Sequence, residues 1–170
     1  AFDKTAKMLG LPYPGGPEID TLAKTGNAAA FDLPRSMLHS GDFAFSFSGL
    51  KTAVLYTLDK LPRPLDPQLL PDFCASIQAA IVDVLVAKTV AAARHCGEKT
   101  VAVSGGVSMN SGLRAALTTA CQRRGLDLRL AAPALTTDNA AMIAFVAALK
   151  FAAGQRDALE TDVDPNLALA

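Results

Sequence analysis

The stretch KTVAVSGGVSMNSGL, residues 99–113, carries the clearest signal of the fold. Residues 100–103 are β-branched or small and apolar without alternation, which is typical of a strand covered on both faces. Gly105 and Gly106 follow at once, and glycine permits a sharp turn and a close approach of the backbone to a bound group. We therefore expect a buried strand that ends in a tight glycine turn.

A helix is predicted directly after this turn. Ser108 or Asn110 can cap it, because a side-chain oxygen at that place accepts a hydrogen bond from the first helical turn. The apolar stripe of the helix consists of Leu113, Leu117 and Cys121, and a glycine at residue 125 is expected to end it. A strand, a glycine turn and a helix N-terminus leave N–H groups facing the loop. The loop is therefore either a seat for an anionic ligand or an ordinary tight turn.

The pattern continues towards the C-terminus. Residues 126–131 alternate in polarity, which predicts a half-exposed strand, and residues 138–153 are apolar nearly all round, which predicts a buried helix. The order strand, helix, strand, helix indicates a right-handed parallel crossover and hence an α/β fold. The acidic, proline-containing residues 155–170 are expected to form a frayed tail.

The first 96 residues are predicted to be mainly helical. Helices are expected at residues 2–9, 18–24, 50–60 and 72–96, with a proline-rich link at residues 61–71. Residues 42–48 alternate phenylalanine with small residues, so we expect a strand whose core face carries Phe43, Phe45 and Phe47. A sheet of about three strands leaves an edge unpaired, and the chain starts abruptly at Ala1. We therefore expect strands to be missing upstream.

Composition limits the classes of function. The chain has 170 residues, 51% hydrophobic and 19% charged, which suits one sizeable core and argues against disorder. Sixteen basic and 16 acidic residues leave no net charge, so any contact with nucleic acid must come from a local patch. The three cysteines (Cys74, Cys96 and Cys121) lack C-x-x-C spacing and are expected to be buried free thiols. The longest apolar run, residues 140–149, is too short to span a bilayer.

Two polar loops, residues 104–110 and 133–139, are predicted to meet at the carboxyl ends of the strands. Asp138 opens the last helix, so it is either the N-cap of that helix or an oxygen ligand for a metal ion completed by histidines from elsewhere. Asp3 has no local pattern of its own. His39 is expected to be a solvated loop residue, and His95 a helix-end cation.

Four motifs together resemble the tRNA N6-adenosine threonylcarbamoyltransferase (TsaD) family, formerly labelled O-sialoglycoprotein endopeptidase. They are AFDKTAKMLGLPYPGGP at residues 1–17, FSFSGLKT at 45–52, SGGVSMN at 104–110 and TTDNAAMIA at 136–144. The resemblance covers only the C-terminal portion of the family pattern. It implies an actin/Hsp70/sugar-kinase-like (ASKHA) fold of two ribonuclease-H-like lobes. Residues 1–154 would be part of the second lobe, incomplete at its N-terminus, and residues 155–170 a tail.

The resemblance also implies an activity. Members of the family transfer threonylcarbamoyl from threonylcarbamoyl-AMP to N6 of adenosine 37 in tRNAs that read ANN codons, which is t6A synthesis. The family pattern places substrate-binding residues at Asp3, Gly16, Asp20 and Asn110, and a metal ligand at Asp138. No further catalytic residue is implied. Carboxylates at residues 3 and 20 suit ribose hydroxyls, and Asn110 offers both a donor and an acceptor to a nucleotide.

The resemblance implies one divalent metal ion, iron or zinc, shared with two histidines that this chain lacks, since neither His39 nor His95 matches the family's histidine pair. The chain alone is therefore expected to be inactive. The implied partners are threonylcarbamoyl-AMP, tRNA and TsaB-like and TsaE-like subunits of a cytoplasmic complex, with no membrane.

Two other functions stay open: a non-catalytic scaffold subunit, and an ATP-dependent phosphotransferase of the same fold. The old peptidase label lacks support, because the sequence has no His-Glu-x-x-His motif. The arginines that might form a basic patch for tRNA are expected instead to lie on solvated faces: Arg114, Arg123, Arg124 and Arg129.

Overall fold

The computed structural model describes residues 1–62 and 65–162. They form two compact units, Ala1–Thr136 and Thr137–Ala170, which we describe separately. The division falls well before the lobe boundary expected after residue 154, and that boundary stays a prediction. The expected proline-rich link includes residues 63 and 64, which lie outside the described residues.

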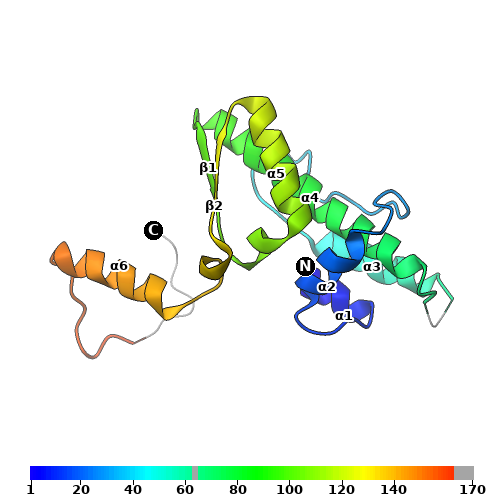
Figure 1. The fold of residues 1–170 in the computed structure, drawn as a ribbon, viewed down its shortest axis with the longest axis horizontal. Coiled ribbons are helices and arrows are strands. Elements are labelled where there is room, and N and C mark those ends of the chain that lie inside the picture. Colours follow the sequence, from blue (N-terminus) through cyan, green and yellow to red (C-terminus); the bar gives the residue numbers. More distant parts are fainter. Residues whose placement is uncertain (63–64, 163–170) are drawn as a thin grey trace. The chain divides into compact units, whose positions relative to one another are not determined.

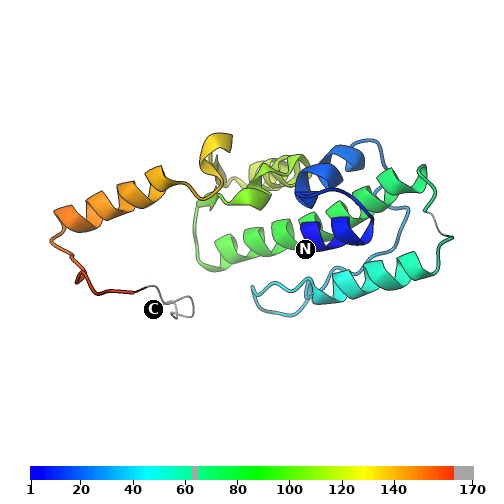
Figure 2. The ribbon, with the colours of Figure 1, turned by 90° about the horizontal axis from the view of Figure 1, so that it is seen from below.

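The first unit is built around one long helix. Four helices precede the sheet: α1 (Phe2–Met8), α2 (Gly15–Ala23), α3 (Ser48–Asp59) and α4 (Leu69–His95). Figures 1 and 2 show that α4 is much the longest of them, with α3 running beside it. The buried core joins α4 to the other three helices through Phe73, Ile77 and Ile81. These three residues recur at helical spacing within the helix expected at residues 72–96.

The local signals explain most of these helices. Gly10, with φ +76°, follows α1 in the left-handed conformation that favours glycine. Leu50, Val54 and Leu58 are buried at helical spacing along α3. Helix α2 begins at Gly15, three residues before the expected start.

The sheet of the described residues has two parallel strands, β1 (Thr100–Val103) and β2 (Asp127–Leu130). Their register pairs Thr100 with Asp127 at one end and Val103 with Leu130 at the other. Helix α5 (Ser111–Arg124) connects them, and Gly125 ends it with φ +66°. The parallel crossover predicted from the sequence is therefore confirmed.

Strand β1 is covered on one face only, not on both as expected. Val101 is buried, whereas Thr100 and Ala102 are exposed. Helices α4 and α5 pack on the buried face through two small clusters, which include Leu117 and Cys121. An apolar strand without alternation needs neighbouring elements on both faces of the sheet. The described part of the chain places helices on one face only.

The strand expected at residues 42–48 is wrong. This segment is irregular, and Phe43 and Phe45 are exposed at its surface. Alternation alone does not make a strand, because a strand needs a neighbour to accept and donate its backbone hydrogen bonds. Here the side chain of Lys88 binds backbone carbonyls of the segment instead.

That segment continues a longer run of chain, residues 27–43, which we call the strap and which overlaps it at residues 42 and 43. The strap follows α4 in the same direction, in blue to cyan beside the helix in Figure 2. Its contacts with α4 are, in order, the Asn27 N–H on Asp72 Oδ1 (2.6 Å), the Phe31 N–H on Ser76 Oγ (3.2 Å), the Arg35 guanidinium on Asp83 Oδ2 (3.0 Å), Lys88 Nζ on Asp42 Oδ1 (3.0 Å), and the Phe43 ring beside the His95 ring (centroids 5.2 Å apart).

The second unit contains helix α6 (Ala140–Ala152). The expectation that this helix is buried is wrong: it has no buried residue, and Ile143, Phe145 and Leu149 are largely exposed. Its nearly uniform apolar character indicates a need for partners, but within the described part of its own unit it is left without a buried residue, although the Arg156 guanidinium lies over the Phe151 ring.

Helix α4 is also long and apolar enough to cross a bilayer, judged by length and composition alone. Half of that apolar stretch is buried against the chain's own elements. This is the usual property of a core helix, and the packing of α4 against α2 and α5 agrees with it.

Candidate functional site

Asp3 joins α1 to the start of α2. Its Oδ1 accepts hydrogen bonds from the N–H groups of Gly15 (2.9 Å) and Gly16 (3.2 Å), so it caps a helix whose own N-cap, Pro14, has no side-chain cap. A Cβ at Gly15 would collide with Ala6, so only glycine allows this approach. The Asp3 Oδ2 atom accepts no hydrogen bond from any residue that the structure describes.

Asp20 joins α2 to the start of α5. Its Oδ1 accepts from both the backbone N–H (3.0 Å) and the hydroxyl (2.7 Å) of Ser111. Asp20 lies four residues after Gly16, so both residues share one face of α2. Asp3 therefore contacts α2 at Gly16, and one turn further along the same face Asp20 contacts the first turn of α5.

Asn110 completes the connection. It is 7% exposed, and its Oδ1 accepts from the Leu113 N–H (2.9 Å), which makes it the N-cap of α5. Of the two caps considered from the sequence, Asn110 is therefore the one used. Its Nδ2 donates to Gln78 Oε1 on α4 (2.6 Å).

Four of the five predicted site residues thus belong to one set of contacts. We call this set the α2–α5 network: Asp3, Gly15, Gly16, Asp20, Gln78, Asn110 and Ser111. Within this network, oxygens of Asp3 and Asp20 and one Nδ2 hydrogen of Asn110 make no hydrogen bond with a described residue and can bind a ligand. The fifth residue, Asp138, belongs to the other compact unit.

The glycine loop follows β1 and is held by an arginine. Gly105 has φ +88°, and residues Gly106–Met109 form a short 3-10 helix. Arg114 donates from Nε to the Ser108 carbonyl (2.7 Å) and from Nη2 to the Ala131 carbonyl (2.9 Å). Arg114 therefore ties the glycine loop to the end of β2 at Ala131, whereas the expected meeting of residues 104–110 with residues 133–139 stays a prediction. Arg114 is not a solvated surface residue as expected.

The hydroxyl of Ser108 is buried inside this loop. The residue is 2% exposed, and within the described part of the chain its Oγ has no hydrogen-bond partner. A buried hydroxyl without a partner costs about 1–3 kcal/mol. Arg114 and the Asn110 cap constrain the loop, and this constraint keeps the Ser108 hydroxyl in its buried position.

The expected anion seat at the start of α5 is largely filled. Asp20 already accepts from the Ser111 N–H, and Asn110 accepts from the Leu113 N–H. The carboxylate of Asp20 also brings negative charge to this helix end, which disfavours a second anion. Side chains of the protein therefore occupy the place proposed for a ligand anion.

Asp138 is exposed, and it is not the N-cap of α6. Asn139 takes that place, with its Oδ1 accepting from the Met142 N–H (3.0 Å). Among the described residues no group of three His, Cys, Asp or Glu side chains is placed to hold a metal ion. Asp138 is then a single carboxylate, which does not make a metal centre by itself.

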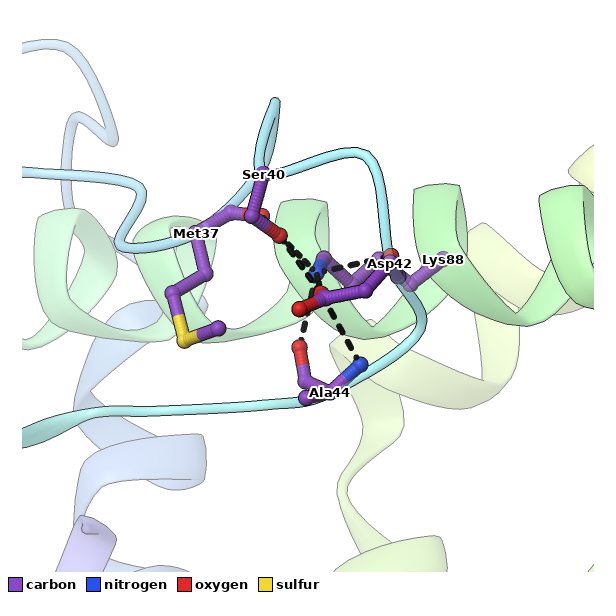
Figure 3. Close-up of polar contacts among 5 residues, drawn as sticks. All are labelled: Met37, Ser40, Asp42, Ala44 and Lys88. Atoms are coloured by element: carbon purple, nitrogen blue, oxygen red, sulfur yellow. Dashed lines mark hydrogen bonds and ion pairs between the residues drawn. The ribbon is translucent and has the colours of Figure 1, made fainter.

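A second polar cluster lies where the strap meets α4 (Figure 3). Lys88 is 3% exposed, and its Nζ donates to Ser40 Oγ, Asp42 Oδ1 and the carbonyls of Asp42 and Ala44, at 2.7–3.1 Å. The Ser40 hydroxyl, and after it Lys88, lowers the pKa of the Asp42 carboxyl below its usual value. We call this the Lys88 clamp. Full pairing is what allows a lysine to be buried in an apolar helix.

Comparison with known proteins decides the family. The sequence model described as "TsaD: tRNA N6-adenosine threonylcarbamoyltransferase" matches residues 1–145. The chain belongs to this family.

Proteins named tRNA N6-adenosine threonylcarbamoyltransferase share about half of their aligned residues with this chain. The protein of Chlorobium chlorochromatii is 49% identical over 97% of this chain and 49% of its own length. The protein of Variovorax paradoxus is 50% identical over 100% of this chain and 49% of its own length. The protein of Paracidovorax citrulli is 55% identical over 91% of this chain and 44% of its own length. The chain therefore spans about half the length of the curated relatives it matches.

Membership of the TsaD family agrees with the α/β architecture and its small parallel sheet. The structure adds three residues that the sequence reasoning missed or misjudged: Gln78, Arg114 and Lys88. A polar residue inside an apolar helical stripe was the available signal for Gln78 and Lys88. An arginine in the first turn of α5, within reach of the preceding loop, was the signal for Arg114.

Proposed function

We propose that the protein acts as a TsaD-family tRNA N6-adenosine threonylcarbamoyltransferase and that this chain supplies its nucleotide-binding residues. The observation that carries the proposal is the α2–α5 network, which joins Asp3, Gly16, Asp20 and Asn110. The family match over residues 1–145 supports it. The chain would then be the larger part of the second ribonuclease-H-like lobe.

The reaction forms a bond between N6 of adenosine 37 and the carbonyl carbon of threonylcarbamoyl-AMP. The bond from that carbon to the phosphate oxygen breaks, AMP leaves, and N6 loses a proton. In this scheme the free oxygens of Asp3 and Asp20 accept hydrogen bonds from ribose hydroxyls. Gly16 and the glycine loop let the nucleotide approach the backbone closely. These residues bind and orient the donor nucleotide, which raises the effective concentration of the reacting groups.

We propose that Asp138 supplies one oxygen ligand to a divalent metal ion, iron or zinc. The described residues supply no further ligands, so the site is incomplete here, and we assign no step of the reaction to the metal ion. The partners that go with this function are tRNA and TsaB-like and TsaE-like subunits in the cytoplasm.

The test is threonylcarbamoyl transfer to a tRNA transcript that contains A37. The chain is assayed with threonylcarbamoyl-AMP alone, and again with the N-terminal half of a relative added in trans. We expect modification only in the combined reaction, and expect Asp20→Asn to lower it while an exposed control, Asp157→Asn, leaves it unchanged. Transfer by the chain alone would overturn the expected dependence on outside ligands. A folded complex with no transfer would overturn the proposed activity and favour a scaffold subunit. Phosphate transfer from ATP would favour a phosphotransferase.

A further inference from the structure

Gln78 is the one residue of the long core helix α4 that reaches the α2–α5 network. It is half-buried, and its neighbours Ile77 and Ala80 are almost fully buried, so the backbone at this position is fixed by the core. Its Oε1 accepts from Asn110 Nδ2 at 2.6 Å. Neither the family resemblance nor the sequence pattern assigned a role to this residue.

The orientation of the Asn110 amide follows from its neighbours. The backbone N–H of Leu113 can only donate, so Asn110 Oδ1 must face it. Nδ2 then faces Gln78, whose Oε1 is the acceptor that it requires. Both contacts agree with the same orientation: turning the Asn110 amide over would lose the bond from Leu113, and also the bond to Gln78 unless the Gln78 amide turned over with it.

A second feature concerns the space available to the Gln78 side chain. A Cβ added at Gly112 would lie 2.6 Å from Gln78 Nε2 and 3.1 Å from its Cδ. The absence of a side chain at Gly112 therefore makes room for the Gln78 amide. The Gln78 side chain lies between Gly112 and Asn110 at the first turn of α5.

We propose that Gln78 is a positioning residue for the nucleotide site: it holds the Asn110 amide so that one Nδ2 hydrogen of Asn110 is presented to a ligand. This inference rests on the proposed function. With Oδ1 used by Leu113 and one Nδ2 hydrogen used by Gln78, one N–H remains. The ligand atom that meets this N–H is then an acceptor, such as a ring nitrogen or an oxygen of the nucleotide.

The test compares three variants in the complete protein. Gln78→Met keeps the length of the side chain but removes the acceptor, and Gln78→Glu keeps an acceptor oxygen. Gln122→Met is the matched control, because Gln122 is an exposed glutamine on α5. The measurements are KM and kcat for threonylcarbamoyl-AMP, the dissociation constant for AMP by calorimetry, and the melting temperature.

We expect Gln78→Met to raise KM and the AMP dissociation constant about tenfold, the loss of about 1.4 kcal/mol of binding. Gln78→Glu should recover most of the affinity, and Gln122→Met should change nothing. A melting temperature close to that of the unmodified protein shows that the fold is kept. Unchanged KM and dissociation constant in Gln78→Met would overturn the inference, as would equal losses in Gln78→Met and Gln78→Glu.

A spectroscopic readout separates this inference from the proposed function. In ¹⁵N-labelled protein the Asn110 side-chain amide proton that faces Gln78 should be shifted downfield by its hydrogen bond, and Gln78→Met should move it upfield, towards the position of an exposed asparagine. If that happens but the unmodified protein neither binds AMP nor transfers threonylcarbamoyl, the proposed function fails while the Gln78 contact stands. Asn110 amide protons that do not respond to Gln78→Met would overturn the inference itself.

Discussion

Helices α4 and α6 are both rich in apolar residues, yet α4 is packed at the centre of its unit, whereas α6 has no buried residue. Helix α4 has 27 residues, of which 12 are buried, and α6 has 13 residues, none buried. Helix α4 packs against α2 and α5 and is followed along its length by the strap. Helix α6 has no such neighbour within the described part of its unit.

The difference shows what an apolar helix requires. Hydrophobic side chains stabilise a fold only through the area that neighbours remove from water. Helix α4 also carries polar residues that bind specific partners: Lys88 holds the strap and Gln78 holds Asn110. Helix α6 has one charged side chain, Lys150, and is otherwise apolar. The core and the candidate nucleotide site therefore depend on the same helix, α4.

The largest expected effect is a cavity in α4. Phe73 is fully buried, and its ring lies 4.3 Å, centroid to centroid, from that of Phe31. Phe73→Ala should lower the free energy of unfolding by about 3–5 kcal/mol. Phe145→Ala on α6, where the side chain is 66% exposed, should change it by less than about 0.5 kcal/mol. Urea unfolding of the 170-residue chain measures both, and equal losses would refute the contrast between the helices.

The next effect concerns the Lys88 clamp. Lys88→Met removes a buried cation and leaves two carbonyls, a hydroxyl and a carboxylate without their donor. We expect a loss of about 1–3 kcal/mol of unfolding free energy and easier proteolysis of the strap. Lys150→Met in the last turn of α6 is the matched control, and we expect it to be neutral. A neutral Lys88→Met would show that the strap is held by its other contacts.

The same clamp predicts a dependence on pH. The Ser40 hydroxyl and Lys88 lower the pKa of Asp42 in the folded chain, so the folded state binds fewer protons than the unfolded chain there. This contribution to stability is present above about pH 4 and is lost as the pH falls through the lowered pKa. Melting temperatures between neutral and acidic pH should fall less steeply in Asp42→Asn than in the unmodified chain. Parallel curves would contradict the predicted role of Asp42.

The smallest effect compares the three thiols: Cys74 on α4, Cys96 just past its end, and Cys121 on α5. Burial raises the pKa of the Cys74 thiol to about 12, and it also raises the pKa of Cys121, whereas Cys96 is exposed at the end of the helix. Only the thiolate reacts with alkylating reagents. Mass spectrometry after native labelling at mildly alkaline pH should therefore find Cys96 modified and the other two protected. Rapid labelling of Cys74 would mean that the core around α4 opens readily.

Much of the fold could be predicted from local patterns. Helix spacing placed Phe73, Ile77 and Ile81 in the core, and Gly125 marked the end of α5 correctly. The parallel crossover followed from the order of the elements around the glycine turn. These features depend on residues close together in the sequence, which is why the sequence alone reveals them.

The wrong strand concerns partners that are distant in the sequence, whereas the error over Cys96 is local. Phe43 and Phe45 alternate as in a strand, but no neighbouring strand pairs with them, and Lys88 binds that backbone instead. The expected cysteine burial holds for Cys74 and Cys121 but is wrong for Cys96, which lies just past the end of α4.

The candidate site shows the same difference between local sequence patterns and contacts that depend on packing. Asp3, Gly16, Asp20 and Asn110 were named from the family motifs, which state identity but not contact. That Asp20 binds Ser111, and that Asn110 binds Gln78, depends on the packing of α2, α4 and α5. The residues of the candidate site could therefore be named from the sequence, whereas the contacts among them could not.

The most direct test of this account is hydrogen exchange of the complete protein with and without threonylcarbamoyl-AMP, read by mass spectrometry. The account predicts slower exchange in the nucleotide-bound protein at residues 15–20 and 105–113, where α2 and the glycine loop carry the α2–α5 network. Slower exchange confined to other parts of the protein, with both segments unchanged, would contradict it.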